Sequence, residues 1–131
     1  MFVCRGLTDK WFCDSAATMG YHVHSLPDSR ARNVLKSHGI ETNHRARVLL
    51  KEDFNKFEYI FGMDHQNITD INQERPKNGG KAKVELLGSY DPQGELIIED
   101  PYYQRGEAGF EVNYQQCMRS CAAFLDKMET K

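Results

Sequence analysis

Residues 59–63 read Tyr-Ile-Phe-Gly-Met, an apolar run that stops at Asp64. This length and composition are typical of a buried β-strand. Two further short stretches have a similar character, at residues 11–17 (Trp-Phe-Cys-Asp-Ser-Ala-Ala) and 81–87 (Lys-Ala-Lys-Val-Glu-Leu-Leu). Segments with helical features alternate with these strands. The alternation predicts an α/β fold, a three-layer sandwich in which helices cover both faces of a mainly parallel sheet.

Three helices are predicted beside these strands. Asp28 is an N-cap for the first, which ends at residues 38–39 (His-Gly), and Asp64 caps a short second helix that extends through Ile71. Near the end of the chain, apolar side chains recur at three- and four-residue spacing, which predicts an amphipathic helix. They are Tyr114, Cys117, Met118, Cys121, Leu125 and Met128.

Composition excludes several classes of protein. Apolar residues make up 40% of the 131 positions, too many for a disordered chain. Seventeen Lys and Arg against nineteen Asp and Glu give a net charge of −2, without the basic excess of a general nucleic-acid binder. Four cysteines are too few for a disulfide scaffold, and no apolar run is long enough for a membrane span or a signal peptide. We expect one domain, residues 1–131, in the reducing cytoplasm, with neither nucleic acid nor membrane as a partner.

Parallel sheets bind ligands outside the carboxyl ends of their strands. In this chain the relevant loops follow Ala17, Met63 and Leu87. Asp64 comes directly after the second strand, and Asp100 lies in the long loop after the third. These two carboxylates are therefore candidate site residues.

Eight stretches together resemble the low-molecular-weight protein tyrosine phosphatases, from about residue 5 to the end of the chain. The Asp-Pro-Tyr-Tyr loop in its context is the most specific of them. They are 14–18 (Asp-Ser-Ala-Ala-Thr), 37–40 (Ser-His-Gly-Ile), 44–47 (His-Arg-Ala-Arg), 51–54 (Lys-Glu-Asp-Phe), 63–64 (Met-Asp), 85–92 (Glu-Leu-Leu-Gly-Ser-Tyr-Asp-Pro), 98–103 (Ile-Glu-Asp-Pro-Tyr-Tyr) and 114–117 (Tyr-Gln-Gln-Cys).

The resemblance implies hydrolysis of phosphotyrosine and aryl phosphates without a cofactor. In that family a cysteine thiolate attacks phosphorus, an aspartic acid protonates the leaving phenol, and water then hydrolyses the phosphocysteine. The cysteine opens a Cys-x5-Arg loop at a helix N-terminus, where backbone N–H groups and the arginine hold the phosphate.

This sequence departs from the family at that loop. None of its four cysteines has arginine six positions later; the residues found there are Lys10, Met19, Ala123 and Lys127. Cys4 resembles the nucleophile at the end of the first strand, but only seven residues separate it from Phe12. A parallel crossover needs about a dozen residues. The phosphate loop and first helix are therefore expected to be missing between Cys4 and Arg5, which truncates the first βα unit and predicts an inactive chain prone to self-association.

The resemblance assigns roles to the remaining residues. Asp100 matches the proton donor. Other residues match family positions that flank the substrate or support the phosphate loop. The paired tyrosines of the Asp-Pro-Tyr-Tyr loop match residues that undergo phosphorylation. The flanking residues are Tyr21, Tyr102 and Tyr103; the supporting residues are Ser15, His44 and Asp64; the phosphorylation candidates are Tyr102 and Tyr103.

Two other patterns were weighed as sites. His22 and His24 supply only two ligands on one short stretch, so we expect no metal. Cys117 and Cys121 share a helix face; we interpret them as small core residues, with a redox or metal pair as the alternative.

Three functions remain open at the level of sequence. The first is a phosphatase relative that has lost catalysis. The second is an active phosphatase whose sequence, as given, omits a real segment. The third is a non-catalytic interaction protein that uses the Tyr102-Tyr103 loop.

Overall fold

The computed structural model describes residues 14–17, 26, 28–41, 47–101 and 106–129. Strands β1 (Tyr59–Gly62) and β2 (Lys83–Leu86) lie parallel, with Tyr59 opposite Lys83 and Gly62 opposite Leu86. A further parallel bridge joins Ala17 to Val48. The predicted parallel sheet is confirmed. The strand predicted for residues 11–17 consists, in its described part, of that single bridge, and residues 11–13 lie outside the described residues.

The strand predicted for residues 81–87 is shorter than expected. Its first two residues donate their backbone N–H groups to the Phe54 carbonyl, at 2.8 and 2.9 Å, so they belong to the preceding loop. After β2 the chain tightens into a 3₁₀ helix, η1 (Leu87–Tyr90). Gly88 allows this turn to lie under the backbone of Leu96, because a Cβ at this position would collide with the Leu96 carbonyl.

The first predicted helix is confirmed as α1 (Ser29–Ser37). The Asp28 side chain accepts a hydrogen bond of 2.8 Å from the backbone N–H two residues on. At the other end Gly39 adopts φ +77°, and it and the next residue donate backbone hydrogen bonds to the carbonyls of Lys36 and Leu35. This is a Schellman motif, which satisfies the last carbonyls of the helix.

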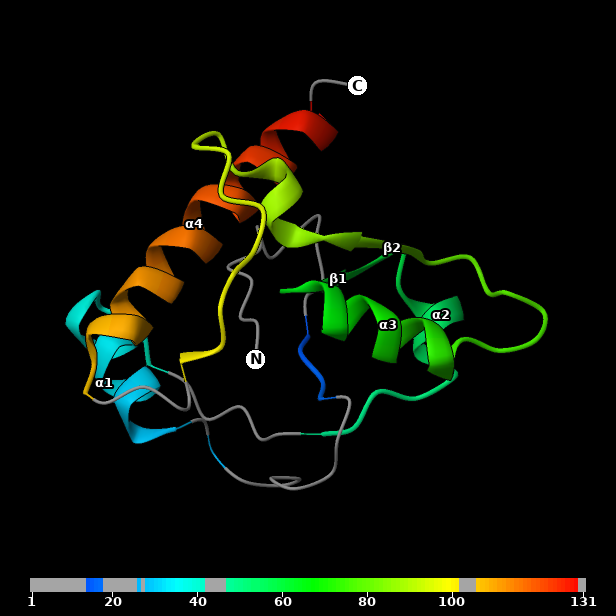
Figure 1. Cartoon of the computed structure of the whole chain (residues 1–131), viewed down its shortest axis with the longest axis horizontal. Coiled ribbons are helices and arrows are strands. Elements are labelled where there is room, and N and C mark those ends of the chain that lie inside the picture. Colours follow the sequence, from blue (N-terminus) through cyan, green and yellow to red (C-terminus); the bar gives the residue numbers. More distant parts are fainter. Residues whose placement is uncertain (1–13, 18–25, 27, 42–46, 102–105, 130–131) are drawn as a thin grey trace.

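Helices cover both faces of the sheet, as Figure 1 shows. Helices α2 (Asp53–Lys56) and α3 (His65–Glu74) lie on one side, and the long α4 (Ala108–Glu129) lies on the other. Ile60 and Phe61 alternate between the faces, since side chains of successive strand residues point in opposite directions. Two clusters of buried residues result. One holds Leu49, Phe54, Ile71 and Ala82, packed by Ile60; the other holds Met63, Leu87, Ile98, Cys117 and Cys121, packed by Phe61.

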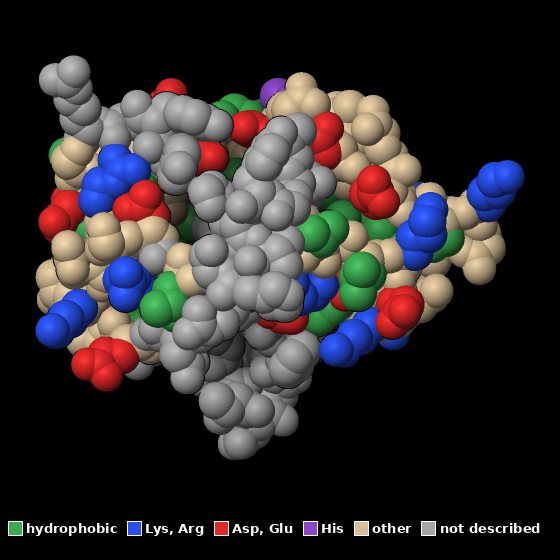
Figure 2. Space-filling view, turned by 90° about the horizontal axis from the view of Figure 1, so that it is seen from below, with side chains coloured by type: hydrophobic (Ala, Val, Ile, Leu, Met, Phe, Trp, Pro, Cys, Tyr) green, Lys and Arg blue, Asp and Glu red, His purple; other side chains and the backbone are tan. Residues whose placement is uncertain are grey.

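The amphipathic helix predicted near the end of the chain is confirmed as α4, which begins six residues before Tyr114, at Ala108. Among the described residues, no helix has the length and apolar character needed to cross a membrane. On the face drawn in Figure 2, Lys and Arg side chains are interspersed with Asp and Glu.

Residues 91–101, here called the strap, run beside α4 (Figure 1). At its first residue the Asp91 carboxylate receives two hydrogen bonds from the Arg119 guanidinium, at 3.0 and 3.1 Å, while its side chain is 0% exposed. The hydrogen bond from Arg119 holds the pKa of Asp91 below its ordinary value, and the backbone N–H of Gln93 acts in the same direction.

This ion pair predicts a specific acid dependence. A carboxylate with a lowered pKa in the folded state stabilises the protein above its ordinary pKa of about 3.9, and this contribution is lost as pH falls through the lower folded value. We expect Asp91→Asn to reduce the free energy of unfolding at pH 7 by about 1–3 kcal/mol, because the guanidinium loses its charged partner. Between pH 4 and pH 2, roughly the window below the ordinary pKa, the free energy of unfolding of the variant should then change less than that of the unmodified protein. Urea unfolding across pH measures both effects.

Arg119→Met is the matched control, because it removes the same ion pair from the other side. Without the guanidinium the pKa of Asp91 is no longer held down while its burial still raises it, so the stability lost between roughly pH 4 and pH 2 should again be smaller than in the unmodified protein. In the double variant the side chain at position 91 no longer titrates, so its acid dependence should match that of Asp91→Asn alone. If the free energy of unfolding of either variant falls as steeply with acidification as that of the unmodified protein, the Asp91–Arg119 ion pair is not the source of the acid dependence.

Candidate active site

The carboxyl end of β1 is organised by the backbone of Met63. Its N–H group donates to Asn67 Oδ1 at 3.0 Å, and its carbonyl accepts from the Ile98 N–H at 2.9 Å. The next residue, Asp64, accepts from the Asn67 N–H at 2.7 Å and caps α3, as predicted. Asn67 was not anticipated from the sequence. Its spacing from the cap, three residues on, is the signal that could have indicated it.

The strap brings Asp100 to this edge of the sheet. Ile98 is 0% exposed and packs against Met63 and Leu87, while Asp100, two residues later, is exposed to solvent. Met63 is therefore the residue that connects the two segments: Asp64 follows it in the chain, and its carbonyl is bonded to the segment that carries Asp100.

Three polar side chains of α4 hold the strap from the other side. Asn113 Nδ2 donates to the Glu99 carbonyl at 3.3 Å. Gln116 Nε2 donates to the Ile97 carbonyl at 3.3 Å and to the Glu95 carboxylate at 2.6 Å. With Arg119 on Asp91, these contacts form a row at three-residue spacing along the helix, which fixes the base of the loop that carries Asp100.

Ser15 lies in a segment that Arg47 holds in place. The Arg47 guanidinium donates to Asp14 at 2.9 Å and to Asp53 at 2.9 and 3.2 Å, and the Ser15 N–H donates to the Asp14 carboxylate at 2.8 Å. The hydrogen bonds to Asp53 and then Asp14 raise the pKa of Arg47, so the guanidinium remains charged. This arginine bridge links the segment of Ser15 to the N-terminus of α2; its role was not foreseen from the sequence.

The first turns of α1 and α4 meet. The Arg30 guanidinium lies 4.6 Å from the centre of the Phe110 ring. Farther along, His38 Nε2 lies 2.7 Å from a Glu111 carboxylate oxygen, and the His38 ring stacks on Tyr114 at 4.0 Å. The first turn of α1 therefore lies beside the first turn of α4.

Several predicted site residues cannot be placed in this arrangement. Five of them, as well as the histidine pair considered for metal binding, lie outside the described residues: Cys4, Tyr21, His44, Tyr102 and Tyr103, with His22 and His24. Within the described part of the chain, no three His, Cys, Asp or Glu residues are grouped as metal ligands.

Comparison with known proteins relates this chain to one family. The profile described as "Low molecular weight phosphotyrosine protein phosphatase" matches residues 2–131. The rat protein of that name is 52% identical over 124 residues, covering 94% of this chain and 78% of the rat protein. The human protein is 50% identical over 124 residues with the same coverage.

Solved structures superpose on this chain with high TM-scores, in agreement with the sequence comparison. The crystal structure of Primo-1 superposes with a TM-score of 0.82 at 46% identity, covering 86% of this chain and 74% of that one. That of DARP, described as a Drosophila arginine phosphatase, gives a TM-score of 0.86 at 37% identity, covering 91% and 78%. The fold class expected from the sequence is thus confirmed, and the chain belongs to the low molecular weight phosphotyrosine protein phosphatase family.

Proposed function

We propose that this chain is a phosphatase-family protein without phosphatase activity of its own. The observation that carries the proposal is the spacing around Cys4: no cysteine is followed by arginine at the sixth position, and seven residues separate Cys4 from Phe12. A nucleophile loop, a helix and a return to the sheet do not fit in that length. Its relatives are phosphotyrosine phosphatases, so phosphotyrosine proteins are the substrate class of an active form.

The residue roles follow from the same proposal. Asp100 occupies the proton-donor position, and Cys4 is the remnant of the nucleophile. Ser15, His44 and Asp64 occupy positions that support a phosphate loop. Asp64 also caps α3 through its side chain, which accepts from the Asn67 N–H.

A second candidate function is that of an interaction protein. Tyr21, Tyr102 and Tyr103 are proposed as recognition residues, with the pair at 102–103 also open to phosphorylation. The observation that favours this function is the anchoring of the strap by Met63 on one side and by α4 on the other, just before the tyrosine pair. A pull-down that compares the phosphorylated and plain forms of the chain tests it: equal capture of proteins by both forms would reject a phosphorylation-controlled docking role.

The remaining proposals concern organisation and location. We place the chain in the cytoplasm as one domain, without nucleic-acid or membrane partners and with a tendency to self-associate. The interspersed charges on the face in Figure 2 and the net charge of −2 support the absence of a nucleic-acid partner.

The activity prediction is direct. The purified chain should not hydrolyse a chromogenic aryl phosphate above background at mildly acid pH, because the activated thiolate, the phosphate cradle and the arginine are all required to lower the barrier. Turnover in the usual enzyme range of ~1–10³ per second that disappears in Asp100→Ala would refute the proposal.

A mass measurement separates this proposal from an omitted segment. Endogenous protein near 15.1 kDa supports a real internal deletion, and a heavier species with an additional internal segment supports an active enzyme.

Phosphate binding gives an independent prediction. Because the missing loop forms the anion site of the family, millimolar phosphate or vanadate should leave the melting temperature unchanged relative to chloride at equal ionic strength. An anion present at 100 times its dissociation constant would stabilise the fold by about 2.7 kcal/mol, which thermal unfolding detects easily. An upward shift seen in phosphate and absent in chloride would show that an anion site exists.

A further inference from the structure

The loop that joins α3 to β2 carries an Asn-Gly pair at its tip. It spans residues 75–82 (Arg-Pro-Lys-Asn-Gly-Gly-Lys-Ala) and extends on the opposite side of the molecule from α4 (Figure 1). Asn78 is exposed, and among the described residues its side chain has no hydrogen-bond partner. The pair therefore presents a side-chain amide to solvent next to a residue without a side chain. The proposed function does not use it.

Contacts of the residues around the pair hold this loop in place. The Arg75 guanidinium donates to the carbonyls of Gly79 and Ala82, the latter at 3.1 Å. It also lies 5.3 Å from the centre of the Phe54 ring. The Phe54 carbonyl in turn accepts from the Lys81 and Ala82 N–H groups, at 2.8 and 2.9 Å. The return of the loop to β2 is thus fixed on α2, while the tip of the loop stays in solvent.

Gly79 supplies a nitrogen atom that is able to attack the neighbouring side chain. Its φ is +85°, and a Cβ at this position would have no atom within 4 Å, so the approach to its nitrogen is open. Its N–H donates to the Pro76 carbonyl at 2.8 Å, closing a turn whose third residue is Asn78. One hydrogen bond in an exposed turn adds little net stability and opens locally. The nitrogen is therefore released from this bond without unfolding of the chain.

The other asparagines in the described part of the chain lie in helices. There the nitrogen of the next residue is held by the helical hydrogen-bond ladder, and none of the next residues is glycine. These asparagines are Asn33 in α1, Asn55 in α2, Asn67 and Asn72 in α3, and Asn113 in α4. The structure therefore distinguishes Asn78 from every one of them.

A second turn of the same form provides an internal comparison. Gly94 has φ +76°, its Cβ position is equally open, and its N–H donates to the Asp91 carbonyl at 2.9 Å. The third residue of that turn is Gln93, which is exposed like Asn78. A glutamine side chain is one carbon longer, so attack on it closes a larger ring and is slower. The two turns thus separate the chemistry of the side chain from the geometry of the backbone.

We propose that Asn78 is a site of self-modification, which the folded chain converts through a succinimide to isoaspartate and aspartate. The Gly79 nitrogen forms a bond to Asn78 Cγ, the bond from Cγ to the side-chain nitrogen breaks, and ammonia leaves with the proton of the Gly79 N–H. Water then adds to one of the ring carbonyls. Opening at Cγ gives aspartate, and opening at the backbone carbonyl gives isoaspartate. Water is the only co-reactant.

The conversion changes both the charge and the main chain of the loop. A carboxylate appears between Lys77 and Lys81, which makes the net charge of −2 more negative by one unit. In the isoaspartate form the main chain also gains one carbon atom, which lengthens the turn that the bond between Gly79 and Pro76 closes. The chain therefore exists in two charge forms, which isoelectric focusing separates.

The experiment follows the folded full-length chain at neutral pH in water enriched in oxygen-18, with peptide mass spectrometry. Each carboxyl formed during the incubation carries the heavy oxygen, and chromatography separates isoaspartate from aspartate. Asn78 should be converted at least about tenfold faster than each helical asparagine, which reacts only after local unfolding. It should also be converted faster than Gln93. Isoaspartate should be among the products, because direct hydrolysis of the side chain gives aspartate alone.

Gly79→Ala is the direct test, since its methyl group shields the attacking nitrogen. It should slow the conversion of Asn78 severalfold. Gly94→Ala is the matched control, because it places the same methyl group at the equivalent position of the second turn, where the Cβ site is equally open. It should leave the conversion of Asn78 unchanged.

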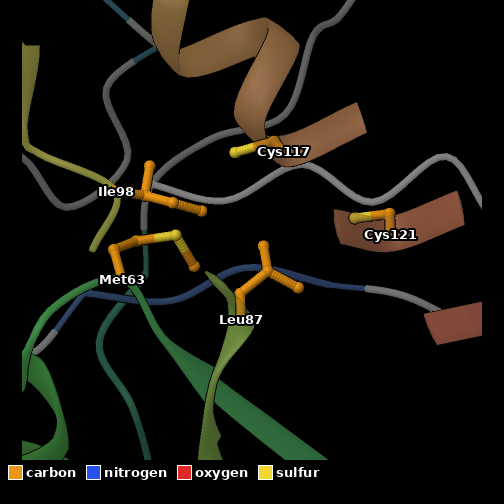
Figure 3. Packing of buried hydrophobic residues seen from close by; sticks show 5 residues of the cluster. All are labelled: Met63, Leu87, Ile98, Cys117 and Cys121. Atoms are coloured by element: carbon orange, nitrogen blue, oxygen red, sulfur yellow. The ribbon is translucent and has the colours of Figure 1, made fainter. Parts of the chain in front are cut away.

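A core variant decides whether the conversion takes place in the folded chain. Leu87 and Ile98 pack in the cluster on the face of the sheet that α4 covers (Figure 3), whereas the loop is fixed to Phe54 on the other face. Leu87→Ala should raise the unfolded fraction, measured by urea unfolding, at least about tenfold and leave the rate at Asn78 unchanged. Ile98→Val is a milder second variant, in case the first folds poorly.

Several results would each overturn the proposal. They are an Asn78 side chain that reacts no faster than the helical asparagines or Gln93, conversion to aspartate alone, and a rate that is unchanged in Gly79→Ala or falls equally in Gly94→Ala. A rate at Asn78 that rises in the core variants together with the unfolded fraction would do the same, since the reaction would then belong to the unfolded chain. None of these measurements depends on phosphatase activity, so their outcome is separate from that of the proposed function.

Discussion

The backbone of Met63 is the junction on which the candidate site depends. Its carbonyl accepts the Ile98 N–H, and its own N–H donates to Asn67. It therefore joins the end of β1 to the strap and to the first turn of α3. Because Met63 itself is 9% exposed and its neighbour Ile98 is 0% exposed, these hydrogen bonds are shielded from competition by water. Asp64 and the segment of Asp100 take their positions from this residue.

The parts of the fold that were predictable from sequence depend on local geometry. Asp28 and Asp64 cap helices within two or three residues of their own positions, and Gly39 ends a helix through bonds within the same turn. Such contacts can be predicted from sequence because both partners lie within a few residues of each other and follow known capping patterns. The apolar run at residues 59–63 was equally informative, because a run of that length has few alternatives to a buried strand.

Apart from the local bonds of Asn67, the contacts that escaped prediction join residues that are not neighbours in the sequence. Arg47 reaches both Asp14 and Asp53, and Arg119 reaches Asp91 across 28 positions. Nothing in the local pattern specifies which carboxylate an arginine will meet. The strand at 81–87 was overestimated for a related reason: the Phe54 carbonyl takes the first N–H groups of the stretch, and this contact depends on tertiary packing.

Structural roles account for several residues that the family resemblance assigns to catalysis. Asp64 caps α3, and the segment of Ser15 is held by the Arg47 bridge, whether or not a phosphate loop is present. The strap is likewise anchored by Met63 and α4. A chain that lost its phosphate loop would keep these residues, because removing them would weaken the fold. The match of such residues to the family pattern is therefore evidence for the scaffold, and the evidence about catalysis lies in the few residues that follow Cys4.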